Sequence, residues 1–176
     1  MRINRFVIML LLLAFTTGAG FALDVLQENV CVVEADETIT GHLYALCLEL
    51  TIDGTVEGSV FAAAVNAQLN GRIDGDVYLL AGDAALNGTL GGDVHVAAGV
   101  IPFTEESAMS GEDANLIAAS LSTRVPQNIT ITGDVIAMGY QLVMEGAVGG
   151  SLDFAGSAFS LNNTVGGNVQ ASVGDS

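Results

Sequence analysis

Residues 52–68 read IDGTVEGSVFAAAVNAQ, residues 69–85 read LNGRIDGDVYLLAGDAA, and residues 86–102 read LNGTLGGDVHVAAGVIP. Glycine and valine recur at matching places in all three segments, so the segments form an internal repeat with a period of 17 residues. A unit this short cannot bury its apolar side chains alone and becomes stable only when it stacks on copies of itself. The repeat therefore predicts a solenoid.

The same frame extends over most of the chain. Numbering the unit from position 1 at Ile52 to position 17 at Gln68, further copies align at 35–51, 127–143, 144–160 and 161–176. The remaining stretch, 103–126, is seven residues longer than one unit, and we interpret it as one irregular coil with insertions on either side of residues 115–120. The sequence thus predicts an all-β, single-domain parallel β-helix of about eight 17-residue coils.

The chemistry of each position indicates which side chains face inward. Positions 1, 5 and 9 are apolar in nearly every copy, and positions 11, 13 and 16 are apolar and often small. We expect these six positions to face the core, and the alternation from position 9 to position 13 indicates a strand with one buried face. Positions 3 and 7 are mostly glycine, which we attribute to corners that need a positive φ or leave no space for a Cβ.

The first 22 residues have the form of a secretory signal peptide. Arg2 and Arg5 precede an apolar run from Phe6 to Phe15, and small residues follow up to Ala22. We expect cleavage there and an extracytoplasmic product, secreted or held in the cell envelope. An uncleaved N-terminal anchor is the alternative. Residues 23–34 would then form an N-terminal cap segment ahead of the solenoid, residues 35–176.

The chain is strongly acidic. It has 20 Asp and Glu residues against 4 Lys and Arg residues, which gives a formal net charge of -16. Nucleic acid is disfavoured as a partner, because phosphate groups are bound by a basic surface. The acidity suits a well-solvated surface that resists unwanted strand pairing. The alternative is that acidic faces bind divalent cations or cationic components of the envelope.

Two cysteines lie near the start of the predicted solenoid. Cys31 and Cys47 are 16 residues apart, one less than the period, so we expect them on neighbouring coils. Neighbouring strands are about 4.8 Å apart, which lies within the Cα separation that a disulfide accepts. Exported proteins retain disulfides, so this pair is a candidate bridge that closes the N-terminal end. Two buried free thiols are the alternative.

Position 10 predicts a stripe of aromatic side chains on the outside of the solenoid. Tyr44, Phe61, Tyr78 and His95 occupy it in four successive copies, on a side otherwise lined by Ala and Leu. An exposed apolar side of this extent is a candidate association surface. Ring stacking that only stiffens the strand ladder is the alternative.

The sequence offers little for catalysis. His42 and His95 are three coils apart, about 14 Å by strand spacing, and they cannot readily act together. The chain has no phosphate-binding loop, nucleophile elbow or metalloprotease motif. The strongest apolar step is four residues, so the six-residue period of the hexapeptide acyltransferases is missing. We therefore expect a non-enzymatic protein without a cofactor or metal.

The repeat resembles that of the bactofilins, the polymer-forming cytoskeletal family, in the units GTVEGSVFAAA, GRIDGDVYLLAG, GTLGGDVHVAAG, GAVGGSLDFAG and NTVGGNVQAS. The resemblance covers residues 35–176. It implies a right-handed parallel β-helix that polymerises end to end into nonpolar filaments without a nucleotide. The apparent export signal and the two cysteines depart from the cytoplasmic members and favour an extracytoplasmic relative.

Two functional hypotheses follow. The first is a structural protein of the cell envelope that assembles with itself into a homopolymer or dimer, because the open ends of a β-helix expose unpaired strand edges. The second is a monomeric extracytoplasmic binding or adhesive domain that uses its acidic faces or the insertion in residues 103–126.

Overall fold

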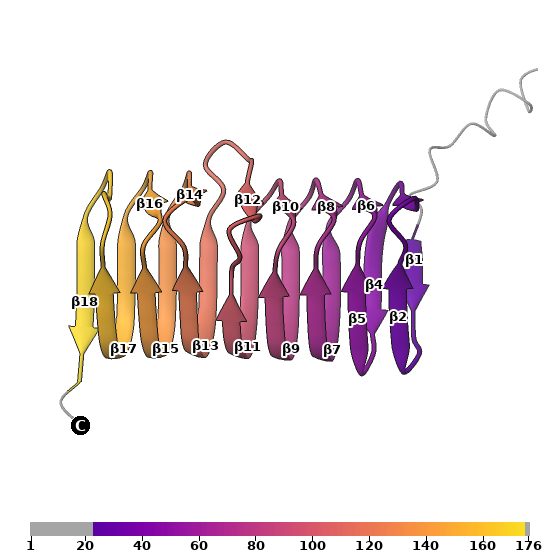
Figure 1. Ribbon diagram of the computed structural model, residues 1–176, viewed down its shortest axis with the longest axis horizontal. Coiled ribbons are helices and arrows are strands. Elements are labelled where there is room, and N and C mark those ends of the chain that lie inside the picture. Colours follow the sequence, from indigo (N-terminus) through magenta and orange to yellow (C-terminus); the bar gives the residue numbers. More distant parts are fainter. Residues whose placement is uncertain (1–22, 175–176) are drawn as a thin grey trace, which may run out of the picture.

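The computed structural model describes residues 23–174 of the chain. Every regular element in that range is a β-strand. The strands stack in parallel along one axis and form an elongated β-solenoid (Figure 1), which confirms the predicted all-β architecture. Within the same range, no helix is long and apolar enough to cross a membrane. The predicted signal peptide, residues 1–22, lies outside the described residues.

One continuous parallel ladder runs the length of the solenoid, in the order β1-β4-β7-β9-β11-β13-β15-β17-β18. Its nine strands belong to nine successive turns, one more than the sequence predicts. Their bounds are Leu23–Leu26 (β1), His42–Leu46 (β4), Val60–Leu69 (β7), Val77–Leu86 (β9), Val94–Pro102 (β11), Leu116–Val125 (β13), Val135–Met144 (β15), Leu152–Leu161 (β17) and Val169–Val173 (β18).

Each complete turn has three sides. The first side holds positions 9–12 and the second holds positions 15–17 with the following position 1; from β7 to β17, one bent strand supplies both. At the N-terminal end the second side is made by separate strands, β2 (Val30–Val33) and β5 (Glu49–Ile52). Two-residue strands form the third side: β3 (Thr38–Ile39), β6 (Thr55–Val56), β8 (Arg72–Ile73), β10 (Thr89–Leu90), β12 (Ala108–Met109), β14 (Thr130–Ile131) and β16 (Ala147–Val148).

The segment 23–34, predicted as a separate cap, forms the first turn of the solenoid. Strand β1 pairs with β4 in parallel, with Leu23 opposite His42, and β2 pairs with β5, with Val30 opposite Glu49. Both pairs are offset by 19 residues (42 − 23 and 49 − 30), two more than the period. The longer offset hides this turn from a 17-residue frame, and it explains the additional turn.

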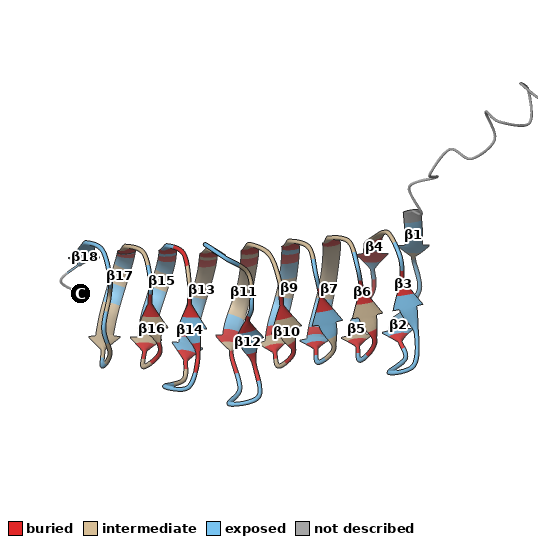
Figure 2. Ribbon diagram, turned by 90° about the horizontal axis from the view of Figure 1, so that it is seen from above, coloured by how far each residue is buried: buried red, intermediate tan, exposed pale blue. Residues whose placement is uncertain are grey.

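Columns of apolar side chains fill the interior. Val60, Val77 and Val94 at position 9 are completely buried, and positions 1, 5 and 16 of the same units are buried as well. Buried residues recur at corresponding places along the solenoid (Figure 2). Position 13 departs from the prediction: Ala64 and Ala81 are only half-buried, because they lie at the bend between the first and second sides.

Close approach between turns, and not a positive φ, requires the glycines at positions 3 and 7. Among the described glycines only Gly139 has a positive φ, 149°. A Cβ on Gly71 would lie 1.9 Å from the carbonyl oxygen of Gly54, and a Cβ on Gly58 would lie 2.4 Å from the carbonyl oxygen of Gly41. The expected lack of space for a Cβ is therefore confirmed, while the expected positive φ at these positions is wrong.

The irregular coil keeps its long strand and accommodates the extra residues around the third side. Val94 pairs with Leu116 at an offset of 22, and Leu116 pairs with Val135 at an offset of 19, so the excess over 17 is five residues before β13 and two after its start. These sum to the seven extra residues seen in the sequence. The predicted insertions on either side of 115–120 are confirmed.

The insertions interrupt the ladder on the third side. β12 ends a five-stranded sheet that begins at β3, and β14 pairs only with β16 among the described strands. The Thr132 hydroxyl spans the gap, because its Oγ1 accepts a hydrogen bond from the Ala114 N–H (2.9 Å) and donates one to the Gly111 carbonyl (2.7 Å). The loops around this break project beyond the other turns (Figure 2).

Replacing Val77 with Asp tests the inward columns. We expect Val77→Asp to lower the free energy of unfolding by about 3 kcal/mol or more, because it buries an unpaired carboxylate. Chemical denaturation measures this loss. Gln68→Asp places the same charge on an exposed position of the neighbouring turn and should change stability by no more than about 0.5 kcal/mol. A Val77→Asp protein that unfolds with the parent would contradict the inward assignment of position 9.

Candidate functional site

A ladder of polar side chains follows the corner that leads into the first side. At position 8, each side chain accepts a hydrogen bond from the backbone N–H at the same position of the next turn. The ladder consists of His42, Ser59, Asp76, Asp93, Asn115, Asp134, Ser151 and Asn168. It crosses the irregular coil without a break, since Asp93 accepts from the Asn115 N–H at 2.8 Å.

The ladder explains His42, which the sequence analysis treated only as a catalytic candidate. Its Nδ1 accepts a hydrogen bond from the Ser59 N–H at 3.0 Å, and its ring lies edge-on to Phe61. His95 occupies position 10, so the structure does not bring the two histidines together. The ladder was missed by sequence reasoning, although position 8 holds His, Ser, Asp or Asn in every copy. Such short side chains with an acceptor atom are the signal that could have revealed it.

The structure brings the four predicted stripe residues together. Ring centroids are 4.9 Å apart from Tyr44 to Phe61, 4.9 Å from Phe61 to Tyr78, and 4.6 Å from Tyr78 to His95. The rings are stacked with interplanar angles of 11°, 3° and 10°. This spacing matches that of the strands beneath them, so the strand register imposes the stacking. Two of the rings, on Tyr44 and Tyr78, remain exposed.

The stripe is part of a larger apolar surface on the first side. Position 10 continues from His95 to Ile117 and Ile136, and position 12 runs parallel to it. Position 12 holds Leu46, Ala63, Leu80, Ala97, Ala119, Met138 and Ala155 in successive turns. Between Tyr44 and Met138 these two positions carry no Asp, Glu, Lys or Arg. We call positions 10 and 12 from Tyr44 to Ala155 the apolar face.

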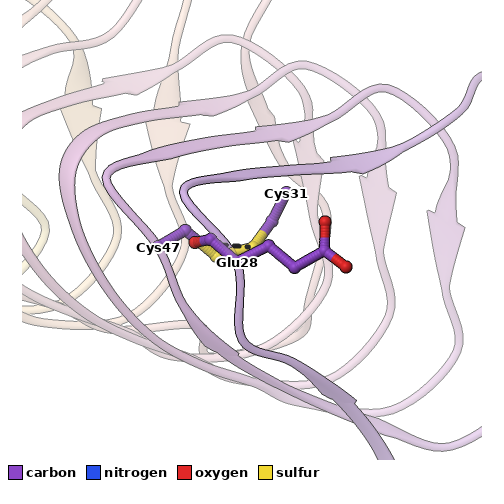
Figure 3. The surroundings of a disulfide bond; sticks show 3 residues. All are labelled: Glu28, Cys31 and Cys47. Carbon is purple, nitrogen blue, oxygen red and sulfur yellow. Dashed lines mark hydrogen bonds between the residues drawn. A yellow bond between two sulfur atoms is a disulfide. The ribbon is translucent and has the colours of Figure 1, made fainter.

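Cys31 and Cys47 form a disulfide near the N-terminal end (Figure 3). Their Cα atoms are 6.1 Å apart, and both residues are buried. Cys31 lies in β2 opposite Leu50, so the bridge joins the first turn to the bend between β4 and β5. The Glu28 carbonyl oxygen lies 3.8 Å from the Cys31 sulfur. This contact is not a hydrogen bond, because a disulfide sulfur carries no hydrogen.

Charged residues are dispersed over the described part of the chain. Both arginines there are paired, Arg72 with Asp74 and Arg124 with Glu145 at 2.9 Å. Nowhere in residues 23–174 do three His, Cys, Asp or Glu side chains gather in a way that could hold a metal ion. The two extended features of the surface are therefore the polar ladder and the apolar face.

Comparison of the chain with models of protein families, with curated proteins and with solved structures gives no match. The function must therefore be argued from the surfaces and edges of the solenoid itself.

Substitution of Asp93 tests the polar ladder. Asp93 accepts hydrogen bonds from the N–H and the side-chain amide of Asn115, at 2.8 and 3.0 Å. We expect Asp93→Ala to cost about 1–3 kcal/mol of unfolding free energy, because a partly buried N–H loses its acceptor. Asp93→Asn keeps an acceptor oxygen and should cost less. The exposed Asp83 provides a control, and an Asp83→Ala loss as large as that of Asp93→Ala would argue against the ladder.

Replacing both cysteines with Ala tests the disulfide. The bridge closes a loop with a sequence separation of 16. We expect Cys31→Ala with Cys47→Ala to lower the unfolding free energy by about 3 kcal/mol, because the unfolded chain gains freedom when the loop opens. Thiol titration of the denatured, unreduced parent should detect no free thiol. Two titratable thiols in protein recovered from outside the cytoplasm would contradict the bridge.

Proposed function

We propose that this chain is a non-enzymatic structural protein, an exported relative of the bactofilins, that associates end to end with copies of itself as a scaffold of the cell envelope. One observation carries this proposal. Strands β1 and β18 are the two ends of the same parallel ladder, on the same side of the solenoid. A β18 edge that meets the β1 edge of another copy therefore continues a ladder that already runs through the molecule.

The edge of β18 is well suited to strand addition. Among the described residues β18 pairs only with β17, and all five of its residues are exposed. Residues 165–174 include no charged side chain, so an approaching strand meets no local repulsion. At the other end, β1 pairs only with β4 within the described range. Both edges thus offer unpaired backbone groups that favour strand pairing.

The polar ladder points to the same junction. Asn168 is its last member, and its N–H donates to Ser151. In every earlier turn, the side chain at this position accepts the N–H of the next turn. Leu23 lies opposite His42 and so occupies position 8 of the first turn. The Leu23 N–H of a second copy is therefore the matching donor for the Asn168 side chain.

Two features support export to the envelope. Residues 1–22 have the charge and hydropathy pattern of a signal peptide. The Cys31–Cys47 disulfide suits an oxidising compartment, since cytosolic thiols are kept reduced.

A second candidate function is a monomeric binding domain that uses the irregular coil. The observation in its favour is that the loops around β12 and β14 project from the solenoid (Figure 2) and expose four acidic residues. These residues are Glu105, Glu106, Glu112 and Asp113. A cationic partner would fit such a projection.

Electron microscopy of the purified protein distinguishes the two functions, and an edge substitution tests the junction. The Leu152 N–H donates to the Asn168 carbonyl and the Gly174 N–H donates to the Gly156 carbonyl, so the N–H of Ala171 points away from β17 by strand alternation. Ala171→Pro removes that outward donor and keeps the bonds to β17. We expect it to raise the concentration needed for assembly by about tenfold or more.

Ala171→Ser is the matched control, because it keeps the N–H and should assemble like the parent. Melting temperatures show whether each variant remains folded. Filaments of Ala171→Pro equal in number and length to those of the parent would contradict the β18 junction. A parent protein that stays a dispersed monomer would favour the binding domain.

A further inference from the structure

The apolar face has a relief of ridges and hollows along position 12. Leu46, Leu80 and Met138 are 57%, 62% and 55% exposed and form the ridges. Alanines fill the turns between and beyond them, at residues 63, 97, 119 and 155. Two shallow apolar grooves follow this relief, one beside Ala63 and one over Ala97 and Ala119. The alternation of large and small side chains gives the face a shape that a partner must match.

We propose that a second copy of this chain is that partner, and that the two solenoids pair side by side, antiparallel, through their apolar faces. This contact lies along the flank of the solenoid and is separate from the end-to-end junction. The pairing is argued from the order of the side chains along positions 10 and 12, from their lack of charge and from the size of the face.

Position 12 is complementary to itself when the order of turns is reversed. A two-fold axis that lies in the interface along the strand direction reverses the turns and keeps each column opposite its own copy. When this axis passes through the turn of His95 and Ala97, every ridge meets an alanine. The facing pairs are Leu46 with Ala155, Leu80 with Ala119, and Met138 with Ala63.

The same axis also orders position 10 favourably. It places the aromatic half of one column against the aliphatic half of the other, with Phe61 opposite Ile136 and Tyr78 opposite Ile117. At the edge of the face, Tyr44 comes opposite Asp153, the first charged residue of the column, so a hydroxyl donor meets a carboxylate acceptor. Aromatic and aliphatic side chains pack well in such pairs.

A parallel arrangement fits poorly. A two-fold axis along the solenoid would place position 10 opposite position 12 of the same turn. Tyr44 would then face Leu46 and Tyr78 would face Leu80, while Phe61 would face Ala63. Large side chains would meet large ones in alternate turns and leave gaps between them, which close packing does not tolerate. The relief therefore selects the antiparallel pair.

The apolar face is large enough for a specific dimer. Seven turns span about 34 Å, and a side of about five residues is about 16 Å wide. Each copy thus contributes about 550 Å², and the pair buries about 1,100 Å², above the roughly 1,000 Å² that specific interfaces need. A cationic partner would dock on the acidic corners rather than here, because this face offers no countercharge between Tyr44 and Met138.

The test measures the mass of the full chain by analytical ultracentrifugation, in an Ala171→Pro background that suppresses end-to-end growth. We expect a dimer. Leu80→Glu should raise the dimer dissociation constant about 100-fold, because each interface then buries two carboxylates without partners. Leu80 is exposed, so the monomer should keep its melting temperature. Ala85→Glu places the same charge on the second side of the same strand, β9, and should leave the dimer intact.

A compensating pair tests the register. Adding Ala119→Arg to Leu80→Glu should restore the dissociation constant to within about tenfold of the starting value, because the antiparallel axis sets these positions opposite each other. Adding Ala63→Arg instead restores the net charge but faces the turn of Met138, so it should not rescue. Equal rescue by both arginine variants would overturn the register.

Other outcomes would overturn the pairing itself. These are a parent that sediments as a monomer at every concentration, a monomer whose apolar face is protected by its own residues 1–22, and binding of neutral lipid vesicles in place of dimerisation. Filament growth is scored separately, in the protein without Ala171→Pro. Failure of the lateral dimer and failure of the end-to-end junction are therefore distinguishable.

Discussion

The parallel hydrogen bonds between turns are the constraint on which the rest of this structure depends. They set a rise of about 4.8 Å per turn and repeat it along the whole solenoid. At that rise, the carbonyl of Gly54 leaves no space for a Cβ on Gly71. The same rise stacks Phe61 on Tyr78 with a ring separation of 4.9 Å and brings each side chain at position 8 within reach of the N–H above it. The repeat in the sequence is therefore a record of contacts between turns more than of contacts within one turn.

The same constraint governs where the chain tolerates extra residues. The first and second sides carry ladders of up to ten residues per strand, whereas the third side carries strands of two. An insertion in a long strand would shift many bonds and turn buried side chains outward. An insertion near the short strands breaks few bonds. Accordingly, the seven extra residues of the irregular coil lie around β12 and before β14, while β11 and β13 keep their full register.

Much of the fold follows from the sequence, because a period makes burial visible. The recurrence of Val60, Val77 and Val94 predicts one interior column, and the rings at position 10 predict the stripe. The turn formed by residues 23–34 did not follow, since its offset of 19 residues breaks the frame. The polar ladder did not follow either. Each of its bonds joins a side chain to the backbone of another turn, and such a partner is known only when the register is known. The reason for the corner glycines was likewise a property of the neighbouring turn.

The break between β12 and β14 has a consequence for how the solenoid unfolds. In a stack of repeats, stability is a sum of local terms and couplings between nearest neighbours, so the chain divides where coupling is weakest. At this break two sides of the solenoid remain continuous and the third does not. Five strands of the long ladder lie on one side of the break and four on the other. The molecule is thereby divided into two cooperative blocks, an N-terminal one secured by the disulfide and a C-terminal one that ends in the exposed strand β18, and the C-terminal block is the one free to open first.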